Sequence, residues 1–279
     1  MAIAVSRDGG HRGDVIREYV TAARFRSPAN ERRSAVAERA ALITGGSSGI
    51  GLAIARALGE DGYGLTVSSR RPEKLEAAAE ELRSAGLEVN AVPANMTDEA
   101  AVAEAVRSHG ERFGRMDVLV NNAGVGIGQP MAEIATKYLD MQLGVNLRAV
   151  IVATREALPM LREAGAEHGK ALIVNTASIA GKSGQPWLSV YSATKAAVIG
   201  FSQATQKEVA GQGIQVTALC PGFVDTPMTE FVREQVKPEE MIRPEDIAAS
   251  VRFLLHTSPA CLVPEIVFSR PDELPGAAA

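Results

Sequence analysis

Short apolar runs alternate with longer segments of helical periodicity along most of this chain. We expect strands at residues 39–43, 64–69, 88–92, 117–121, 171–176, 214–219 and 266–268, and helices through 52–58, at 72–85, 98–113 and 136–164, and around Tyr191 to about 210. Strands that alternate with helices favour a parallel sheet with helices on both faces. The pattern therefore predicts the α/β class, with a doubly wound parallel sheet of about seven strands.

The composition favours one large domain. The 279 residues are 46% hydrophobic and 22% charged, which is enough to bury one core without a second domain. We expect this domain at residues 39–270. A partly helical or disordered extension at 1–38 would precede it, and a loose tail at 271–279 would follow it.

Charge and composition narrow the classes of function. A net charge of −4 gives no electrostatic reason to bind nucleic acid, and no apolar run is long enough to span a membrane. The four histidines lack metal-ligand spacing, so we predict no metal. Cys220 and Cys261 are too few for a secreted disulfide framework, and we interpret both as packed apolar groups of a cytoplasmic protein.

A glycine-rich turn, Thr44-Gly45-Gly46-Ser47-Ser48-Gly49-Ile50-Gly51, joins the first strand to the first helix. Such glycines permit a tight turn and close approach of a pyrophosphate, and the helix N-terminus favours the anion. Glycine clusters also form ordinary turns, but the strand before and the helix after favour a dinucleotide site. The expected contacts are Gly45, Ser47, Ser48, Gly49, Ile50 and Gly51.

The second expected strand ends at Ser69 and is followed at once by Arg70 and Arg71. In a dinucleotide fold this strand end faces the adenosine ribose, where an acid prefers the free 2′-hydroxyl and arginine accepts a 2′-phosphate. The alternative is that the arginines only sit on a solvated helix start, where cations are disfavoured without an anion. We therefore predict that Ser69, Arg70 and Arg71 select NADP(H) over NAD.

Tyr191 and Lys195 are four residues apart in an expected helix, so their side chains can share one face, and Ser178 follows the strand at 171–176. A cation about 4 Å from a phenol is worth up to ~4 kcal/mol at an effective dielectric of ~20, which lowers the tyrosine pKa. Such a tyrosine can transfer protons at neutral pH. The same spacing is common on solvated helices, so the other motifs decide between the two interpretations.

With Asn121-Asn122-Ala123-Gly124, Asn146 and Pro221-Gly222 in order, the chain resembles the single-domain branch of the short-chain dehydrogenase/reductase family and is similar to 3-oxoacyl-[acyl-carrier-protein] reductases. The resemblance covers about residues 40–268. It implies a Rossmann-type fold and a carbonyl reductase that transfers a hydride between nicotinamide and a small-molecule carbonyl or secondary alcohol. A 3-oxoacyl thioester and a lipophilic ketone are both candidate substrates.

The resemblance also implies roles for individual residues. Tyr191 would be the acid and base on the substrate oxygen, while Lys195 would lower the pKa of Tyr191 and bind the nicotinamide ribose. Ser178 would donate a hydrogen bond to the reacting oxygen, and Asn146 would hold a helix distortion and a water of the proton relay. Further coenzyme contacts are expected after the later strands, at Asn122, Ala123, Gly124, Pro221, Gly222, Val224 and Thr226.

Two segments depart from the family pattern. Asn95 and Met96 stand where relatives carry an acid that contacts the adenine, although the Asn95 oxygen can still accept that bond, and Asp98 is expected to cap the next helix. Residues 261–271 replace the usual glycine-rich closing strand. This change leaves the association state open between a homodimer and a homotetramer.

The segments that face the substrate allow several interpretations. Residues 227–238 are predicted to form a mobile lid, and their apolar side chains favour a lipophilic substrate, with ordinary helix packing as the alternative. Trp187 and Gln185 either line the pocket or pack their own loop. Two other functions stay open: a non-catalytic NADP-binding regulator or scaffold, which would typically lack one of the three catalytic side chains, and an epimerase, which would have a different glycine spacing.

Overall fold

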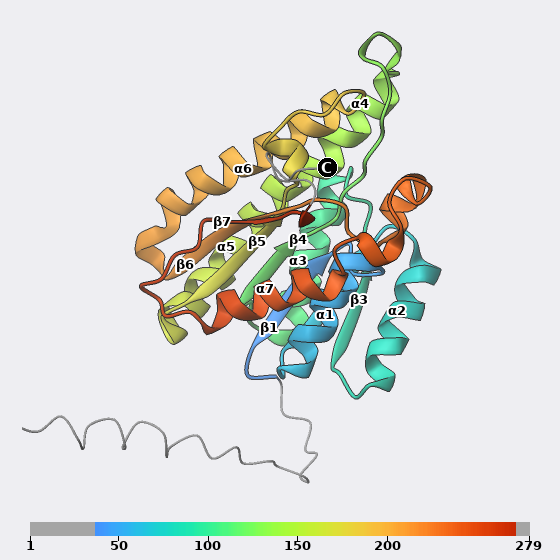
Figure 1. Cartoon of the computed structure of the whole chain (residues 1–279). Helices are drawn as coiled ribbons and strands as arrows, with labels where there is room; N and C mark the ends of the chain where they lie inside the picture. The colour runs from blue at the N-terminus through green and yellow to red at the C-terminus, as the bar shows by residue number, and fades with distance from the viewer. Residues whose placement is uncertain (1–36, 272–279) are drawn as a thin grey trace, which may run out of the picture. The chain divides into compact units, whose positions relative to one another are not determined.

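The computed structural model describes residues 37–271, which form one parallel sheet with helices on both faces (Figure 1). The strands are β1 (Ala40–Thr44), β2 (Gly64–Ser69), β3 (Val89–Pro93), β4 (Val118–Asn121), β5 (Ala171–Thr176), β6 (Ile214–Pro221) and β7 (Glu265–Phe268). The helices are α1 (Gly49–Glu60), α2 (Pro72–Ser84), α3 (Glu99–Phe113), α4 (Thr136–Leu143), α5 (Ala149–His168), α6 (Ser189–Val209) and α7 (Pro244–His256). The strand order is β3-β2-β1-β4-β5-β6-β7.

Alternating residues of the strands divide the core into two halves. In β1, Ala41 and Ile43 pack in a cluster with α1, α2 and α7, whereas Leu42 packs in a second cluster with α3, α5 and α6. Because helices cover both faces, the central strands are buried along their whole length, and they appear in the sequence as continuous apolar runs. This is why the runs predict the strands so closely.

The doubly wound sheet of seven strands is confirmed, and each strand lies within two residues of its expected bounds. Asp98 caps α3 as expected, because its carboxylate accepts a 2.9 Å hydrogen bond from the Ala100 amide. The expectation that both cysteines are packed is half right, since Cys220 is buried and Cys261 is exposed. The expectations for residues 1–36 and 272–279 lie outside the described residues.

Two helical features depart from the expected elements. The helix expected at 136–164 is interrupted by a π-helical turn at Gly144–Arg148 and continues to His168. Helix α7 has no counterpart among the expected elements, although Pro244 in its first turn and buried Ile247 and Val251 at helical spacing are typical of one.

The sheet topology determines where a ligand can bind. From β1 the chain winds outward through β2 to β3, and it then returns to the other side of β1 to form β4, β5, β6 and β7. In an open parallel sheet, ligands bind beyond the carboxyl ends of the strands at this reversal. Within residues 37–271, no helix is long and apolar enough to cross a membrane, and no three potential metal ligands of the His, Cys, Asp or Glu type are grouped.

A buried carboxylate joins the starts of the two central strands. Asp117, just before β4, accepts a 2.8 Å hydrogen bond from the amide of Ala40, the first residue of β1. It also accepts two hydrogen bonds of 2.8 Å from the guanidinium of Arg115. A buried donor that loses its acceptor costs about 1–3 kcal/mol, and more when it is charged.

We expect Asp117→Ala to lower the free energy of unfolding by about 3 kcal/mol, because the Ala40 amide loses its side-chain acceptor and Arg115 loses this carboxylate and keeps its ion pair with Glu167. Urea denaturation of the purified protein measures this change. Asp140→Ala, at an exposed position of α4, is the control and should have little effect. Equal stability of the two variants would contradict a structural role for Asp117.

Candidate active site

Tyr191 and Lys195 lie one turn apart near the start of α6, beside the carboxyl end of β5. Lys195 is only 4% exposed, and its Nζ lies 5.7 Å from the centroid of the Tyr191 ring. The ammonium donates a 2.7 Å hydrogen bond to the carbonyl oxygen of Thr176, the last residue of β5. The structure therefore brings the tyrosine and the lysine together, as their spacing predicts, and it ties the lysine to the sheet.

Burial governs the pKa values of both groups. It raises the pKa of Tyr191 above that of a free phenol, and the neighbouring Ser178 hydroxyl opposes this rise only in part. The expected lowering of the Tyr191 pKa is therefore wrong for this structure, in which the lysine ammonium donates to Thr176. Burial also lowers the pKa of Lys195 to about 8, so most molecules still carry this charge at neutral pH.

Ser178 begins the 3₁₀ turn Ile179–Gly181 that follows β5. Its Oγ accepts a 3.1 Å hydrogen bond from the Ala180 amide and donates at 3.4 Å to the Pro221 carbonyl. Its effect on the pKa of Tyr191 indicates that this hydroxyl lies beside the phenol. Two hydroxyl donors in this arrangement can share one substrate oxygen, on which negative charge develops during carbonyl reduction.

Asn146 lies in the π-helical turn, which is the helix distortion that the family resemblance implies. Its Oδ1 accepts a 2.8 Å hydrogen bond from the Val125 amide, and its Nδ2 donates at 2.9 Å to the Val125 carbonyl. The same nitrogen donates at 3.1 Å to the Thr194 hydroxyl of α6. Asn146 thus connects the segment after β4 to the helix that carries Tyr191; its role in a water relay stays a prediction.

The segment after β4 lies between the glycine-rich turn and the catalytic lysine. The Thr44 hydroxyl accepts hydrogen bonds from the amides of Asn122 and Ala123 at 3.0 and 3.1 Å, and the Asn122 side chain donates to the Thr44 carbonyl at 3.2 Å. A Cβ on Gly124 would lie 3.6 Å from Lys195 Nζ. Of the three predicted coenzyme contacts in this segment, Asn122 and Ala123 therefore join the glycine-rich turn, and Gly124 borders the catalytic lysine.

The glycine-rich turn has the backbone that its sequence predicts. Gly45 and Gly49 have φ values of +68° and +53°, in the region that glycine adopts without strain. A Cβ on Gly51 would lie 2.4 Å from the Gly45 carbonyl oxygen, so only glycine permits this closure. The turn also holds Ser47, Ser48 and Ile50 at the start of α1, where free main-chain amides favour an anion.

The end of β2 fits a phosphate group. Arg70 and Arg71 are exposed, and neither guanidinium makes a hydrogen bond or ion pair with another residue in 37–271. Beside them, the buried hydroxyl oxygens of Ser68 and Ser69 have no hydrogen-bond partner in this part of the chain. Two uncompensated cations next to unpaired hydroxyl groups are suited to an anion that the chain does not itself supply.

Asn95 and Met96, after β3, differ in exposure. Met96 is buried, whereas Asn95 is exposed and its Oδ1 accepts a 3.3 Å hydrogen bond from the Thr97 amide. An amide oxygen has two lone pairs, so one remains for an adenine amino group. The predicted contact is chemically possible, and the local bond to Thr97 holds the side chain in place.

The segment after β6 is held by its own hydrogen bonds. Pro221 ends β6, and the Gly222 amide donates at 2.8 Å to the carbonyl of Phe268 in β7. The Val224 carbonyl accepts a 2.5 Å hydrogen bond from the Thr229 hydroxyl. A Cβ on Gly49 would lie 2.8 Å from Thr226 Cγ2, so this segment returns to the glycine-rich turn.

Three threonines that sequence reasoning does not select hold the site together. Thr44 orients the segment after β4, Thr194 accepts the Asn146 hydrogen bond, and Thr176 binds Lys195. Thr44 directly precedes the first glycine of the turn, and this position could have identified it from the sequence. Thr176 acts through its main-chain carbonyl, which no residue type reveals.

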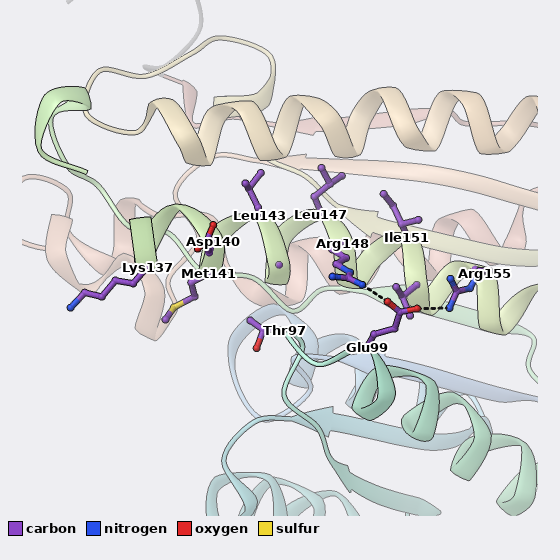
Figure 2. Close-up of a pocket in the computed structure, with 12 residues that line it drawn as sticks. Thr97, Glu99, Lys137, Asp140, Met141, Leu143, Leu147, Arg148, Ile151 and Arg155 are labelled. Atoms are coloured by element: carbon purple, nitrogen blue, oxygen red, sulfur yellow. Dashed lines mark hydrogen bonds and ion pairs between the residues drawn. The ribbon is translucent and has the colours of Figure 1, made fainter. Parts of the chain in front are cut away.

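A wide groove lies away from these groups, on the outer surface of α4, the π-helical turn and α5 (Figure 2). None of the four predicted catalytic residues lines it. Arg148 and Arg155 both pair with Glu99 of α3, the latter at 2.9 Å (Figure 2). Leu143 and Ile151 are 42% and 41% exposed there, so the groove combines an apolar helix face with an ion-pair network.

Comparisons with known proteins agree with this geometry. A family model described as short chain dehydrogenase matches residues 39–237. A protein of Streptomyces coelicolor named putative ketoacyl reductase is 39% identical over 237 residues, which are 77% of this chain and 89% of that protein.

Two solved structures are similar over nearly their whole length. A variant of actinorhodin polyketide ketoreductase with NADPH has a TM-score of 0.76 and 35% identity, and the match covers 83% of this chain and 96% of that one. A 3-ketoacyl-(acyl-carrier-protein) reductase from Brucella melitensis complexed with NADH has a TM-score of 0.75 and 30% identity, over 85% of this chain and 99% of that one. Together with the Rossmann-type sheet and the order of the motifs, these matches show that the chain belongs to the short-chain dehydrogenase/reductase family of oxidoreductases.

Proposed function

We propose that the protein is an NADP(H)-dependent ketoreductase that reduces a carbonyl group to a secondary alcohol and can run in reverse. The observation that carries this proposal is the meeting of Tyr191, Lys195 and Ser178 at the carboxyl end of β5. The names of the similar ketoacyl reductases support the same reaction class.

The chain offers a continuous set of groups for the coenzyme. The glycine-rich turn would bind the pyrophosphate, Arg70 and Arg71 would bind the 2′-phosphate, and the segments after β4 and β6 would enclose the nucleoside and nicotinamide. When bound, the reduced nicotinamide supplies the hydride that adds to the carbonyl carbon. One similar structure is complexed with NADH, so the preference of this protein for NADP(H) over NAD is tested below.

The protein's own groups handle the proton. Because burial raises the pKa of Tyr191, the phenol keeps its proton at neutral pH and can donate it to the substrate oxygen. Ser178 donates a second hydrogen bond to that oxygen. The Lys195 cation, 5.7 Å from the Tyr191 ring centroid, stabilises the phenolate left after proton transfer.

A panel of carbonyl compounds, followed by the absorbance of NADPH, tests this function directly. Oxidation of NADPH with at least one ketone is expected. Tight NADPH binding without oxidation by any member of the panel would instead identify a non-catalytic regulator or scaffold of the same fold.

We also propose that the chain associates through the groove on α4 and α5, at least as a homodimer. An apolar helix face, with Leu143 and Ile151 more than two fifths exposed, is typical of a protein–protein contact.

We place the protein in the cytoplasm, because its two cysteines are both free and a reducing compartment keeps thiols in that state.

Tyr191→Phe should lower kcat by at least ~100-fold, because the proton donor is lost, while NADPH affinity stays nearly unchanged, because the ring is retained. Steady-state rates and a fluorescence titration of NADPH measure the two effects. Tyr138→Phe on α4 is the matched control and should keep full activity. Wild-type turnover by Tyr191→Phe would exclude the proposed proton transfer.

Arg70→Ala and Arg71→Ala should each raise the KM for NADPH about tenfold, because each removes a charge-assisted contact to the 2′-phosphate. The KM for NADH should not rise, since NADH lacks that group. Lys74→Ala, at an exposed position in the first turn of α2, serves as the control. An unchanged ratio of NADPH to NADH efficiency in both variants would remove the assignment.

Ile151→Arg should convert the associated form to a monomer, because it buries an unpaired charge in the proposed contact. Light scattering after size-exclusion chromatography measures the mass. Glu163→Arg, at an exposed position further along α5, adds a cation as well and should leave the mass unchanged. A wild-type mass equal to one chain would end the proposal.

A further inference from the structure

The single tryptophan of the chain has a strained backbone near the catalytic tyrosine. Trp187 lies in the loop before α6, and its φ is +53°. It is the only non-glycine residue within 37–271 with a positive φ. Bulky residues rarely adopt this conformation, and where they do, surrounding contacts hold them in it, often at ligand sites.

The indole is held from two sides. A Cβ on Gly128 would lie 1.8 Å from Trp187 Cε3, so the ring rests directly on the Gly128 backbone, and the Gln129 amide donates at 2.8 Å to the Trp187 carbonyl. On another side, Phe231 meets the indole edge to face, with ring centroids 5.9 Å apart and planes at 85°. Phe231 belongs to the 3₁₀ segment Pro227–Val232, which follows the proposed nicotinamide segment.

The same backbone leads from Trp187 to the catalytic tyrosine. A Cβ on Gly126 would lie 3.7 Å from Tyr191 Cε2 and 4.0 Å from Met228 Sδ. Gly126 and Gly128 are separated by at most about 7 Å of extended chain, so the indole and the phenol border one short wall. Trp187, Met228 and Phe231, which we name the apolar rim, are 49%, 45% and 54% exposed.

We propose that the apolar rim binds the flat ring of an aryl ketone whose carbonyl oxygen reaches Tyr191 and Ser178, which makes Trp187 and Phe231 specificity-determining residues. This inference rests on the ketoreductase activity proposed above. The edge-to-face contact leaves both aromatic rings about half exposed, and aromatic rings gain stabilisation from stacking beyond the burial of their area. A short acyl chain would cover these rings only in part.

The selectivity between two ketone substrates tests whether the apolar rim binds an aryl ring. We compare tetralone, a bicyclic aryl ketone, with acetoacetyl-N-acetylcysteamine, an acyclic thioester, and use the ratio of their kcat/KM values. Trp187→Gly and Phe231→Ala should each lower the tetralone-to-thioester ratio about tenfold, mainly through the KM for tetralone. Phe253→Ala on α7 is the matched control, because Phe253 is also 54% exposed, and its ratio should stay at the wild-type value.

The outcomes separate the two proposals. If the wild type reduces neither compound nor any other carbonyl, the proposed function fails. If it reduces the thioester but not tetralone, or if both rim variants keep the wild-type ratio, the inference about the rim is overturned. Trp187→Gly also relieves the strained φ, so loss of activity through unfolding is not expected for this variant.

Tryptophan fluorescence gives a readout without turnover. Since Trp187 is the only tryptophan, the emission of the Tyr191→Phe variant with NADP⁺ reports on the rim alone. Tetralone should change this emission saturably, and adding Phe231→Ala should raise its apparent Kd about tenfold, whereas adding Phe253→Ala should not. No saturable change, or an equal Kd in all three proteins, would overturn the inference.

Discussion

The hydrogen bond from the Lys195 ammonium to the Thr176 carbonyl holds the catalytic end of the molecule together. It joins α6 to the end of β5, and it does so with a cation that is 4% exposed. Burying an ammonium is unfavourable unless polar groups compensate it, and the lowered pKa of Lys195, about 8, records this cost. Tyr191 lies one turn away on the same helix, so the bond attaches the helix that carries the phenol to the sheet.

The surrounding residues make that arrangement possible. Gly124 lies beside the ammonium, since a Cβ there would be in van der Waals contact with Lys195 Nζ at 3.6 Å. Asn146 uses the wider turn of a π-helix to bond the backbone at Val125 on one side and Thr194 of α6 on the other. Most polar side chains of the site are therefore held by hydrogen bonds within the protein, many of them to main-chain atoms. Only a few side chains remain to contact a substrate.

The sequence predicts the scaffold well and the electrostatics of the site poorly. Strand β5 has its expected bounds, because a strand buried on both faces carries an unbroken apolar run, here Ala171-Leu172-Ile173-Val174. The glycine-rich turn is likewise visible, since its backbone requires glycine at Gly45 and Gly49. The direction of the Tyr191 pKa shift is not visible, because it is set by how deeply the fold buries the phenol. The partner of Lys195 is not visible either, because it is a main-chain carbonyl that any residue type could provide.

Contacts between segments that are far apart in the chain also cannot be predicted from this sequence. The π-helical turn follows only from the family resemblance, since the apolar periodicity continues across it. The pairing of Trp187 with Phe231 joins loops that follow different strands, and neither residue indicates the other.

The left-handed conformation of Trp187 has a consequence for protein engineering. Glycine adopts this backbone without strain, whereas other side chains placed at position 187 keep the strain and depend on contacts such as those with Gly128 and Phe231 to offset it. A library of substitutions at this position therefore varies backbone stability and the shape of the loop surface together.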